Sequence, residues 1–166
     1  IEVSGKHLVS IPRITIRRFL EEFKLTVQAE AVNSFWDSRA KGILTKRPEK
    51  LGQELLGVFA NAKLASRGAA IREGTSGIGF VDVQVTFSSG LLHVVELKML
   101  KGVSLPGSTQ LATYMAQKKR KEGWLVLLDV RRWSQKKPVP ATILRPSGII
   151  RTVLIELNPI PPSRLP

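Results

Sequence analysis

Two acids and one lysine interrupt segments of the chain that are otherwise apolar. Asp82 stands in GFVDVQV, and Glu96 and Lys98 stand in HVVELKM. A charge inside an apolar segment is rarely retained without a partner or a task. Two carboxylates held close together repel each other, and they need a compensating cation, usually a metal ion or a basic group. These residue types therefore indicate a site where carboxylates and an amine act together, provided that the fold brings them to one face.

The elements that must position these residues form a predicted β-hairpin, with strands over 80–87 and 91–99. The loop between them has three residues and ends on glycine, which tolerates positive φ. If the strands close directly at this loop, Asp82 lies opposite Glu96 with both side chains on the same face. Lys98 follows two residues later and points the same way.

A preceding helix, predicted to begin at Pro48 and to stop before Gly68, offers a third carboxylate. Glu54 borders the apolar stripe that would pack on the sheet, so it can reach the face of the two acids. We expect Glu49 to serve only as a favourable charge in the first turn of the helix. The residues of the predicted stripe are Leu51, Leu55, Val58, Phe59 and Ala62.

A plainer interpretation stays open for each of these residues. Asp82 and Lys98 would form a cross-strand ion pair on a solvated face, with Glu96 incidental. Glu54 would be an exposed helical residue beside Lys50.

The remaining periodicities predict an α/β (α+β) domain with a mixed sheet and helices packed against it. The expected order is one or two helices, a helix, three strands, a helix, a buried strand and two weaker strands. Their ranges are 14–42, 48–67, 69–73, 80–87, 91–99, 108–121, 124–130, 142–144 and 150–157. We expect a helical extension over residues 1–45 that packs on a core over 46–158, and an extended tail over 159–166.

Asp82, then Glu96-Leu97-Lys98 on the adjoining strand, resembles the PD-(D/E)xK nuclease superfamily. The next helix carries Gln110-Leu-Ala-Thr-Tyr114, which is similar to the Q-x-x-x-Y motif of the RecB-like branch. The stretch 79–130 is similar to nuclease modules found C-terminal to ATPase-type proteins. The resemblance covers residues 48–130, half of the chain, and departs from the pattern at Val81, where the family often has proline.

The resemblance implies a restriction-endonuclease-like core (helix, three strands, helix, strand), with extra N-terminal helices and C-terminal strands. It also implies an Mg²⁺- or Mn²⁺-dependent nuclease that hydrolyses phosphodiester bonds through an activated water. The implied metal ligands are Asp82, Glu96, the backbone carbonyl of Leu97 and Glu54. Lys98 would orient the water or stabilise the transition state, and Gln110 and Tyr114 would flank Lys98 and hold a phosphate or the metal-bound water.

Charge indicates the class of partner. The chain has 166 residues, 26 Lys and Arg, 13 Asp and Glu, and a formal net charge of +13. Such a surplus favours a polyanionic partner, most often nucleic acid, and the resemblance favours DNA over RNA. The predicted nucleic-acid contacts are Lys101, Lys118, Lys119, Arg120, Lys121, Arg131 and Arg132. Lys118–Lys121 could equally be the solvated end of a helix, where cations are favourable.

Composition excludes several classes of protein. The chain has no cysteine, so disulfides, thiolate metal sites and cysteine nucleophiles are excluded. No apolar run is long enough to span a bilayer, which excludes an integral membrane protein. Glu21 and Glu22 on the first predicted helix disfavour an anionic membrane surface, so we expect no membrane partner. The first residue is Ile1 and no secretory signal pattern follows, so we expect a piece of a longer chain or complex. Its expected location is the cytoplasm, with the nucleoid, or the nucleus, and Trp36 leaves a homo-oligomer open.

Three functions follow from these observations. The first is the metal-dependent nuclease. The second is a catalytically inactive nucleic-acid-binding or assembly domain of the same fold. The third is a basic structural protein of a ribonucleoprotein in which the D…ExK spacing is coincidence, and it predicts no sheet that carries these residues.

Overall fold

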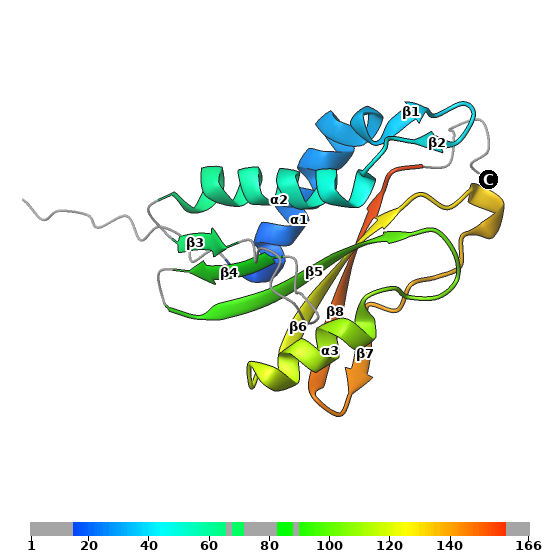
Figure 1. The fold of residues 1–166 in the computed structure, drawn as a ribbon. Coiled ribbons are helices and arrows are strands. Elements are labelled where there is room, and N and C mark those ends of the chain that lie inside the picture. The colour runs from blue at the N-terminus through cyan, green and yellow to red at the C-terminus, as the bar shows by residue number, and fades with distance from the viewer. Residues whose placement is uncertain (1–14, 66–67, 72–82, 88–89, 159–166) are drawn as a thin grey trace, which may run out of the picture.

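A six-stranded mixed sheet carries three α-helices (Figure 1). The computed structural model describes residues 15–65, 68–71, 83–87 and 90–158, and for 68–71 it describes the backbone only. The α-helices are α1 (Ile16–Thr26), α2 (Pro48–Leu64) and α3 (Ser108–Gln117). Shorter helical turns are η1 (Val27–Ala31), η2 (Val32–Phe35) and η3 (Trp133–Gln135). The strands are β1 (Trp36–Ser38), β2 (Ile43–Leu44), β3 (Gly68–Ile71), β4 (Val83–Phe87), β5 (Leu92–Leu100), β6 (Glu122–Asp129), β7 (Thr142–Arg145) and β8 (Gly148–Glu156).

The main sheet has the strand order β3-β4-β5-β6-β8-β7, and β1 and β2 form a separate pair. The pairs β3–β4, β4–β5 and β7–β8 are antiparallel, whereas β5–β6 and β6–β8 are parallel. Two parallel steps at the centre put β5 and β6 between neighbours on both sides, and β6 is apolar along nearly its whole length, as expected of a central strand. This is the mixed α+β architecture that the sequence predicts.

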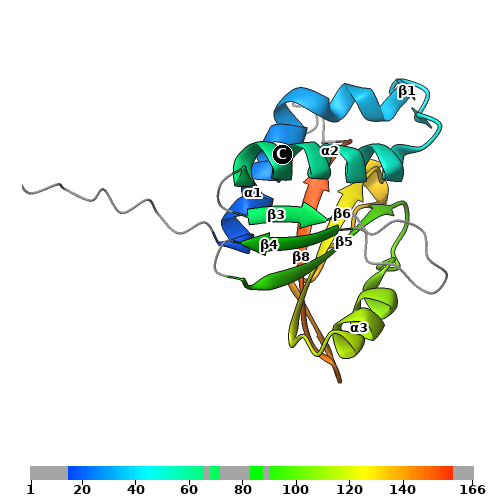
Figure 2. The same ribbon diagram turned by 60° about the vertical axis from the view of Figure 1, so that its left-hand side comes forward.

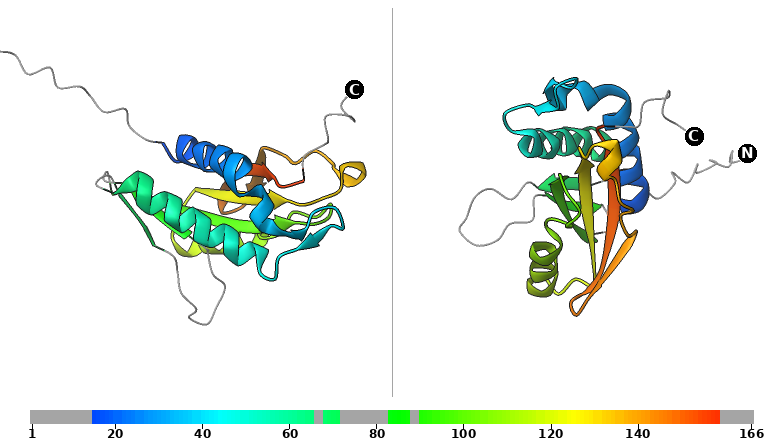
Figure 3. Two further views of the ribbon diagram at one scale, coloured as in Figure 1. Left: turned by 90° about the horizontal axis from the view of Figure 1, so that it is seen from above. Right: turned by 90° about the vertical axis from the view of Figure 1, so that its right-hand side faces the viewer.

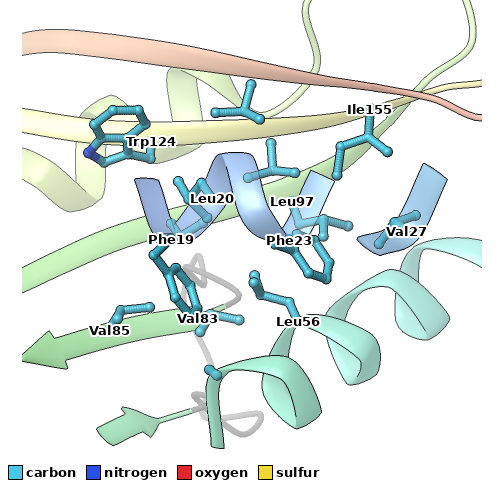
Figure 4. Packing of buried hydrophobic residues seen from close by; sticks show 14 of the residues in the cluster. Phe19, Leu20, Phe23, Val27, Leu56, Val83, Val85, Leu97, Trp124 and Ile155 are labelled. Atoms are coloured by element: carbon cyan, nitrogen blue, oxygen red, sulfur yellow. The ribbon is translucent and has the colours of Figure 1, made fainter. Parts of the chain in front are cut away.

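Helices α1 and α2 cover one face of the sheet and α3 covers the other (Figure 2). On the first face, Phe19 and Phe23 of α1 pack with Leu56 of α2 and Leu97 of β5 (Figure 4). On the second face, α3 packs against a smaller cluster that includes Val94 and Leu100 of β5. Figure 3 shows the sheet edge-on between these two layers. Because side chains alternate along a strand, β5 contributes to both cores.

The hairpin of β4 and β5 has the predicted register. Val83 pairs with Val95, and Thr86 pairs with Leu92. The loop closes with the Phe87 amide donating to the Leu91 carbonyl at 3.3 Å, and its last residue, Gly90, has φ of +77°. The predicted strands at 69–73, 124–130, 142–144 and 150–157 correspond to β3, β6, β7 and β8.

Helix α2 begins at Pro48 as predicted, and its predicted stripe is confirmed in part. Leu51, Leu55 and Phe59 are partly buried and pack against the core, whereas Val58 and Ala62 are exposed. The fully buried positions are Gly52, Leu56, Ala60 and Leu64. The packing is close at Gly52, where a Cβ would lie 2.6 Å from Leu128 Cδ1. A glycine adds nothing to an apolar periodicity, so the sequence pattern does not reveal this contact.

Two predicted helices are too long. The segment predicted as helix over 14–42 ends its helical turns at Phe35 and continues as the β1–β2 hairpin. The indole Nε1 of Trp36 donates to the Leu157 carbonyl at 3.1 Å, which fastens this hairpin to the end of β8. Helix α3 ends at Gln117, because Lys119 has φ of +53° and cannot continue an α-helix. No helix in the described ranges is long and apolar enough to cross a membrane.

Candidate functional site: a carboxylate–lysine cluster on β5

Glu96 and Lys98 lie on the α3 face of β5, between Val94 and Leu100. The Glu96 side chain has 0 % exposure, and its Oε1 lies 3.1 Å from Lys98 Nζ, whose side chain is itself mostly buried. Glu96 and Lys98 are two residues apart, so the alternation of side chains along a strand predicts that they lie on the same face. They do, and they form an ion pair that is largely shielded from water. This part of the predicted site is therefore assembled within one strand.

Glu49, in the first turn of α2, joins this pair. Its Oε1 lies 3.0 Å from Lys98 Nζ, and its Oε2 accepts the Met99 amide at 3.3 Å. The ammonium of Lys98 thus lies between two carboxylates, and the cluster of three side chains keeps one net negative charge. We call Glu49, Glu96 and Lys98 the carboxylate–lysine cluster.

The helical carboxylate of this cluster is not the one that the sequence favours. Glu54 is half exposed and lies 3.7 Å from Lys50, an i,i+4 pair of the kind that the plainer interpretation expects. Its role as a metal ligand stays a prediction. Glu49 was expected to act only on the helix terminus. The signal for its contact was the proline start at residue 48, which puts the first turn beside the end of β5.

Gly107 covers the cluster from the α3 side. It precedes α3 with φ of +79°, and a Cβ there would lie 2.7 Å from Lys98 Cγ and 3.2 Å from Glu96 Cγ. Only glycine combines this backbone conformation with so close an approach. The sequence pattern did not identify this residue, although a glycine directly before a predicted helix is a usable signal.

The backbone of Leu97 points to the same side of β5 as the Met99 amide that donates to Glu49. Alternate residues of a strand direct their backbone groups to the same side, so the Leu97 carbonyl lies on this side as well. The described pairing of β4 with β5 ends at Val83 and Val95, just before this point.

Asp82 lies outside the described residues, and its place opposite Glu96 stays a prediction. The register of β4 and β5 over 83–86 is the one on which that prediction depends.

Gln110 and Tyr114 both lie on α3, on the same sheet face as Glu96. Tyr114 is buried, and its hydroxyl accepts a hydrogen bond from Gln84 Nε2 at 2.5 Å. This hydrogen bond connects α3 to β4. Gln84 can reach α3 because it pairs with Val94, which lies on the face of the sheet that α3 covers. The expectation that Gln110 and Tyr114 flank Lys98 and hold a phosphate stays a prediction. Gln84 was not identified from the sequence.

Arg131 corrects the predicted nucleic-acid interface. Its guanidinium is buried, with Nε donating to Asp129 Oδ1 and Nη2 to Asp129 Oδ2, both at 2.9 Å. The hydrogen bonds to Asp129 raise the pKa of the Arg131 guanidinium above its ordinary value. A side chain bound in this two-pronged way inside the protein is not a surface contact for phosphate.

The other predicted basic residues are accessible but fall in two places. Lys118–Lys121 precede β6, whereas Lys101 and Arg132 follow β5 and β6. Since β5 and β6 run parallel, these groups lie at opposite ends of the sheet, separated by about 25 Å of strand. They do not form one patch.

The donor chemistry of the cluster suits a hard divalent cation. Carboxylate oxygens and a backbone carbonyl are the ligands that Mg²⁺ and Mn²⁺ prefer, and the net charge of the cluster is negative. Within the described ranges, no three residues among His, Cys, Asp and Glu form a ready metal-holding group. A complete ligand set on this face would therefore need Asp82, as predicted.

Comparison with curated proteins and with solved structures finds no match for this chain. One family matches residues 14–132, which span α1 to the segment after β6 and include the whole carboxylate–lysine cluster. The chain belongs to this family, which is described as a domain of unknown function, DUF8371.

Proposed function

We propose that this protein is a metal-dependent nuclease that hydrolyses phosphodiester bonds in DNA, and in RNA as the second choice of substrate. The observation that carries the proposal is the buried pair of Glu96 and Lys98 on one face of β5, with their charged atoms 3.1 Å apart. A charge buried in this way is costly, and a catalytic task is one reason for a protein to keep it.

The arrangement of elements supports the proposal. The order α2, β3, β4, β5, α3, β6 corresponds to the helix–three strands–helix–strand order that the resemblance to PD-(D/E)xK nucleases implies. A restriction-endonuclease-like core is part of the proposal. The register of the hairpin is compatible with Asp82 facing Glu96.

Asp82, Glu96 and the Leu97 carbonyl would hold Mg²⁺ or Mn²⁺, with Glu49 or Glu54 of α2 contributing directly or through water. When bound, such an ion lowers the pKa of a coordinated water and neutralises charge on the scissile phosphate. The Lys98 ammonium holds the Glu96 carboxylate at 3.1 Å, and Gly107 packs beside the Glu96 side chain near its Cγ.

Lys98 would act on the phosphate and on the attacking water. Its ammonium has three N–H donors, and Glu96 and Glu49 fix its position at 3.1 Å and 3.0 Å. A donor fixed in a site sheltered from water stabilises developing negative charge without reorganising. The amide of Gln110 and the hydroxyl of Tyr114 would assist at the same face.

One observation favours the second function, a nucleic-acid-binding or assembly domain without catalysis. Lys98 already lies between two carboxylates, so the cluster is partly neutralised by its own residues. A buried ion pair of this kind can serve the fold alone. The third function predicts no sheet carrying these residues, and the sheet position of Glu96 and Lys98 counts against it.

The test is cleavage of labelled single- and double-stranded DNA and RNA with Mg²⁺ or Mn²⁺ and with EDTA. We expect metal-dependent cleavage that Asp82→Asn and Lys98→Gln each reduce by 100-fold or more, on the order of one lost transition-state contact. Glu21→Gln, on the exposed side of α1, serves as the charge-matched control for Asp82→Asn and should cleave as the unmodified protein does.

Absence of cleavage by the unmodified protein on all four substrates would reject the nuclease and leave the binding domain. As a nuclease, the protein would act where its substrate lies, in the cytoplasm with the nucleoid or in the nucleus.

A further inference from the structure

A hollow of about 440 Å³ opens at the carboxyl ends of β5 and β6. Its walls come from two connections, residues 101–103 after β5 and residues 134–137 after β6, which Figure 1 shows at the same end of the sheet. Three of the lining side chains are lysines (Lys101, Lys136 and Lys137), and none is acidic. The hollow is therefore basic, and it is separate from the carboxylate–lysine cluster.

The wall of the hollow is held in place by the buried arginine. The Arg131 guanidinium donates to the Asp129 carboxylate at the end of β6, and its Nη1 donates to the Lys137 carbonyl at 3.1 Å. Lys136 Nζ lies 3.0 Å from Glu156 Oε1 at the end of β8. The segment that lines the hollow is thus fixed to the ends of two strands, so the hollow is shaped before any ligand arrives.

The three lysines of the hollow differ in whether their charge is already used inside the protein. The ion pair with Glu156 uses the charge of Lys136, whose side chain is only 13 % exposed. Lys101 and Lys137 are exposed, and they supply the positive charge that a ligand would meet. The ligand that fits this charge is therefore anionic, and two ammonium groups from two different lining segments suit a chain of phosphates better than a single carboxylate.

An exposed tryptophan directly precedes the lining residues in the chain. Trp133 begins the 3-10 helix that continues into the lining residues Ser134 and Gln135, and it is 46 % exposed. Val103, from the lining segment after β5, is 66 % exposed. Bases stack on exposed aromatic rings where their faces are free, which is the case in single strands but not inside a duplex.

We propose that this hollow binds a single-stranded segment of nucleic acid, with phosphates on Lys101 and Lys137 and one base stacked on Trp133. The proposal deepens the proposed nuclease function, on which its link to cleavage depends. Lys101 follows Lys98 by three residues, or about 10 Å along an extended chain, so a strand held in the hollow passes close to the carboxylate–lysine cluster.

The experiment measures binding without cleavage, in EDTA. A fluorescein-labelled oligothymidylate and a duplex of equal length are titrated with the full chain, and fluorescence anisotropy gives each Kd at several salt concentrations. Tryptophan emission is followed in parallel, because Trp133 is the most exposed of the three tryptophans. We expect tighter binding of the single strand, with quenching of the indole emission.

Two variants test the assigned contacts. Trp133→Ala should weaken single-strand binding about tenfold and remove most of the quenching, and Trp133→Phe should retain part of the affinity. Lys101→Gln with Lys137→Gln should make the slope of log K against log salt shallower by about 1.4, or about 0.7 for each lost phosphate contact. Far-UV circular dichroism of each variant establishes that it is folded.

A matched control removes the same charge from exposed lysines outside the hollow and outside the predicted nucleic-acid contacts. Lys41→Gln with Lys46→Gln, beside the β1–β2 pair, should keep both the preference for single strands and the quenching. The proposal is overturned if this control loses as much affinity as the pair in the hollow, if folded Trp133→Ala binds like the unmodified protein, or if the duplex binds more tightly. Quenching by phosphatidylserine vesicles but not by the oligonucleotide would overturn it in favour of a lipid surface.

The same data separate this inference from the proposed function. Binding without cleavage in Mg²⁺ or Mn²⁺ would reject the nuclease and keep the hollow as a single-strand site. Cleavage that survives in Trp133→Ala and in the hollow double variant, with unchanged substrate preference, would reject the hollow and keep the nuclease.

Discussion

Replacing Gly107 by alanine tests whether the carboxylate–lysine cluster is as tightly covered as the structure indicates. The new Cβ would lie 2.7 Å from Lys98 Cγ and 3.2 Å from Glu96 Cγ. Both contacted atoms lie near the backbone, and both side chains are fixed at their far ends by their ion pair, so neither can move aside cheaply.

Two costs add for Gly107→Ala. A non-glycine residue at φ of +79° costs about 1 to 2 kcal/mol. Crowding a packed site adds about 1 to 3 kcal/mol. We therefore expect the free energy of unfolding to fall by about 2 to 5 kcal/mol.

Gly90→Ala is the matched control. Gly90 has nearly the same φ, +77°, but a Cβ there meets nothing within 4 Å. It should lose only the backbone part, about 1 to 2 kcal/mol. Urea unfolding followed by circular dichroism gives both values. Equal losses for the two variants would refute the close packing of Gly107 on the cluster.

Three further predictions concern stability. Glu49→Gln should lower the free energy of unfolding by about 1 to 3 kcal/mol, because the Glu49 carboxylate accepts hydrogen bonds from an ammonium and a backbone amide. Glu54→Gln, at an exposed position, should change it by less than about 0.5 kcal/mol. Similar urea midpoints for the two variants would contradict this ranking. Asp129→Leu should cost about 3 to 5 kcal/mol by leaving Arg131 charged and buried, and adding Arg131→Met should restore most of the loss, so a double variant no better than the single one would disprove the pairing. Burial lowers the pKa of His93 in the folded protein, so the unfolded chain binds a proton first as the pH falls below about 6.5, and the free energy of unfolding decreases. Between about pH 7 and pH 5, the melting temperature should therefore fall less for His93→Gln than for the unmodified protein. Parallel curves for the two proteins would exclude His93 as the cause.

The β-hairpin was predictable because three local signals agree. The alternation of apolar residues, the short loop and its final glycine all require the same register, and the structure has it over 83–86. The start of α2 was predictable for a similar reason, since proline at the first helical position is a local preference.

The errors arise where tertiary contacts override local preference. The most deeply buried line of α2 includes Gly52, which packs against Leu128, and a count of apolar residues does not register this contact. The sequence predicts Arg131 as a surface residue, because it does not show that Asp129, two residues earlier, is buried and needs a cation. Glu49 was undervalued because its partners, Lys98 and the Met99 amide, lie about 50 residues away along the chain.

Gly52 has a consequence for the site one helical turn away. Gly52 lets α2 pack closely on the sheet. Glu49 lies three residues before Gly52, in the first turn of α2, and contacts Lys98 of β5. A side chain at position 52 would press on the buried methyl groups of Leu128 and Leu97, so either these methyl groups or the helix itself would have to move. An interior glycine lowers the stability of a helix by about 1 kcal/mol relative to alanine. In return, Gly52 allows α2 to lie close to the sheet, which brings the Glu49 carboxylate within reach of Lys98.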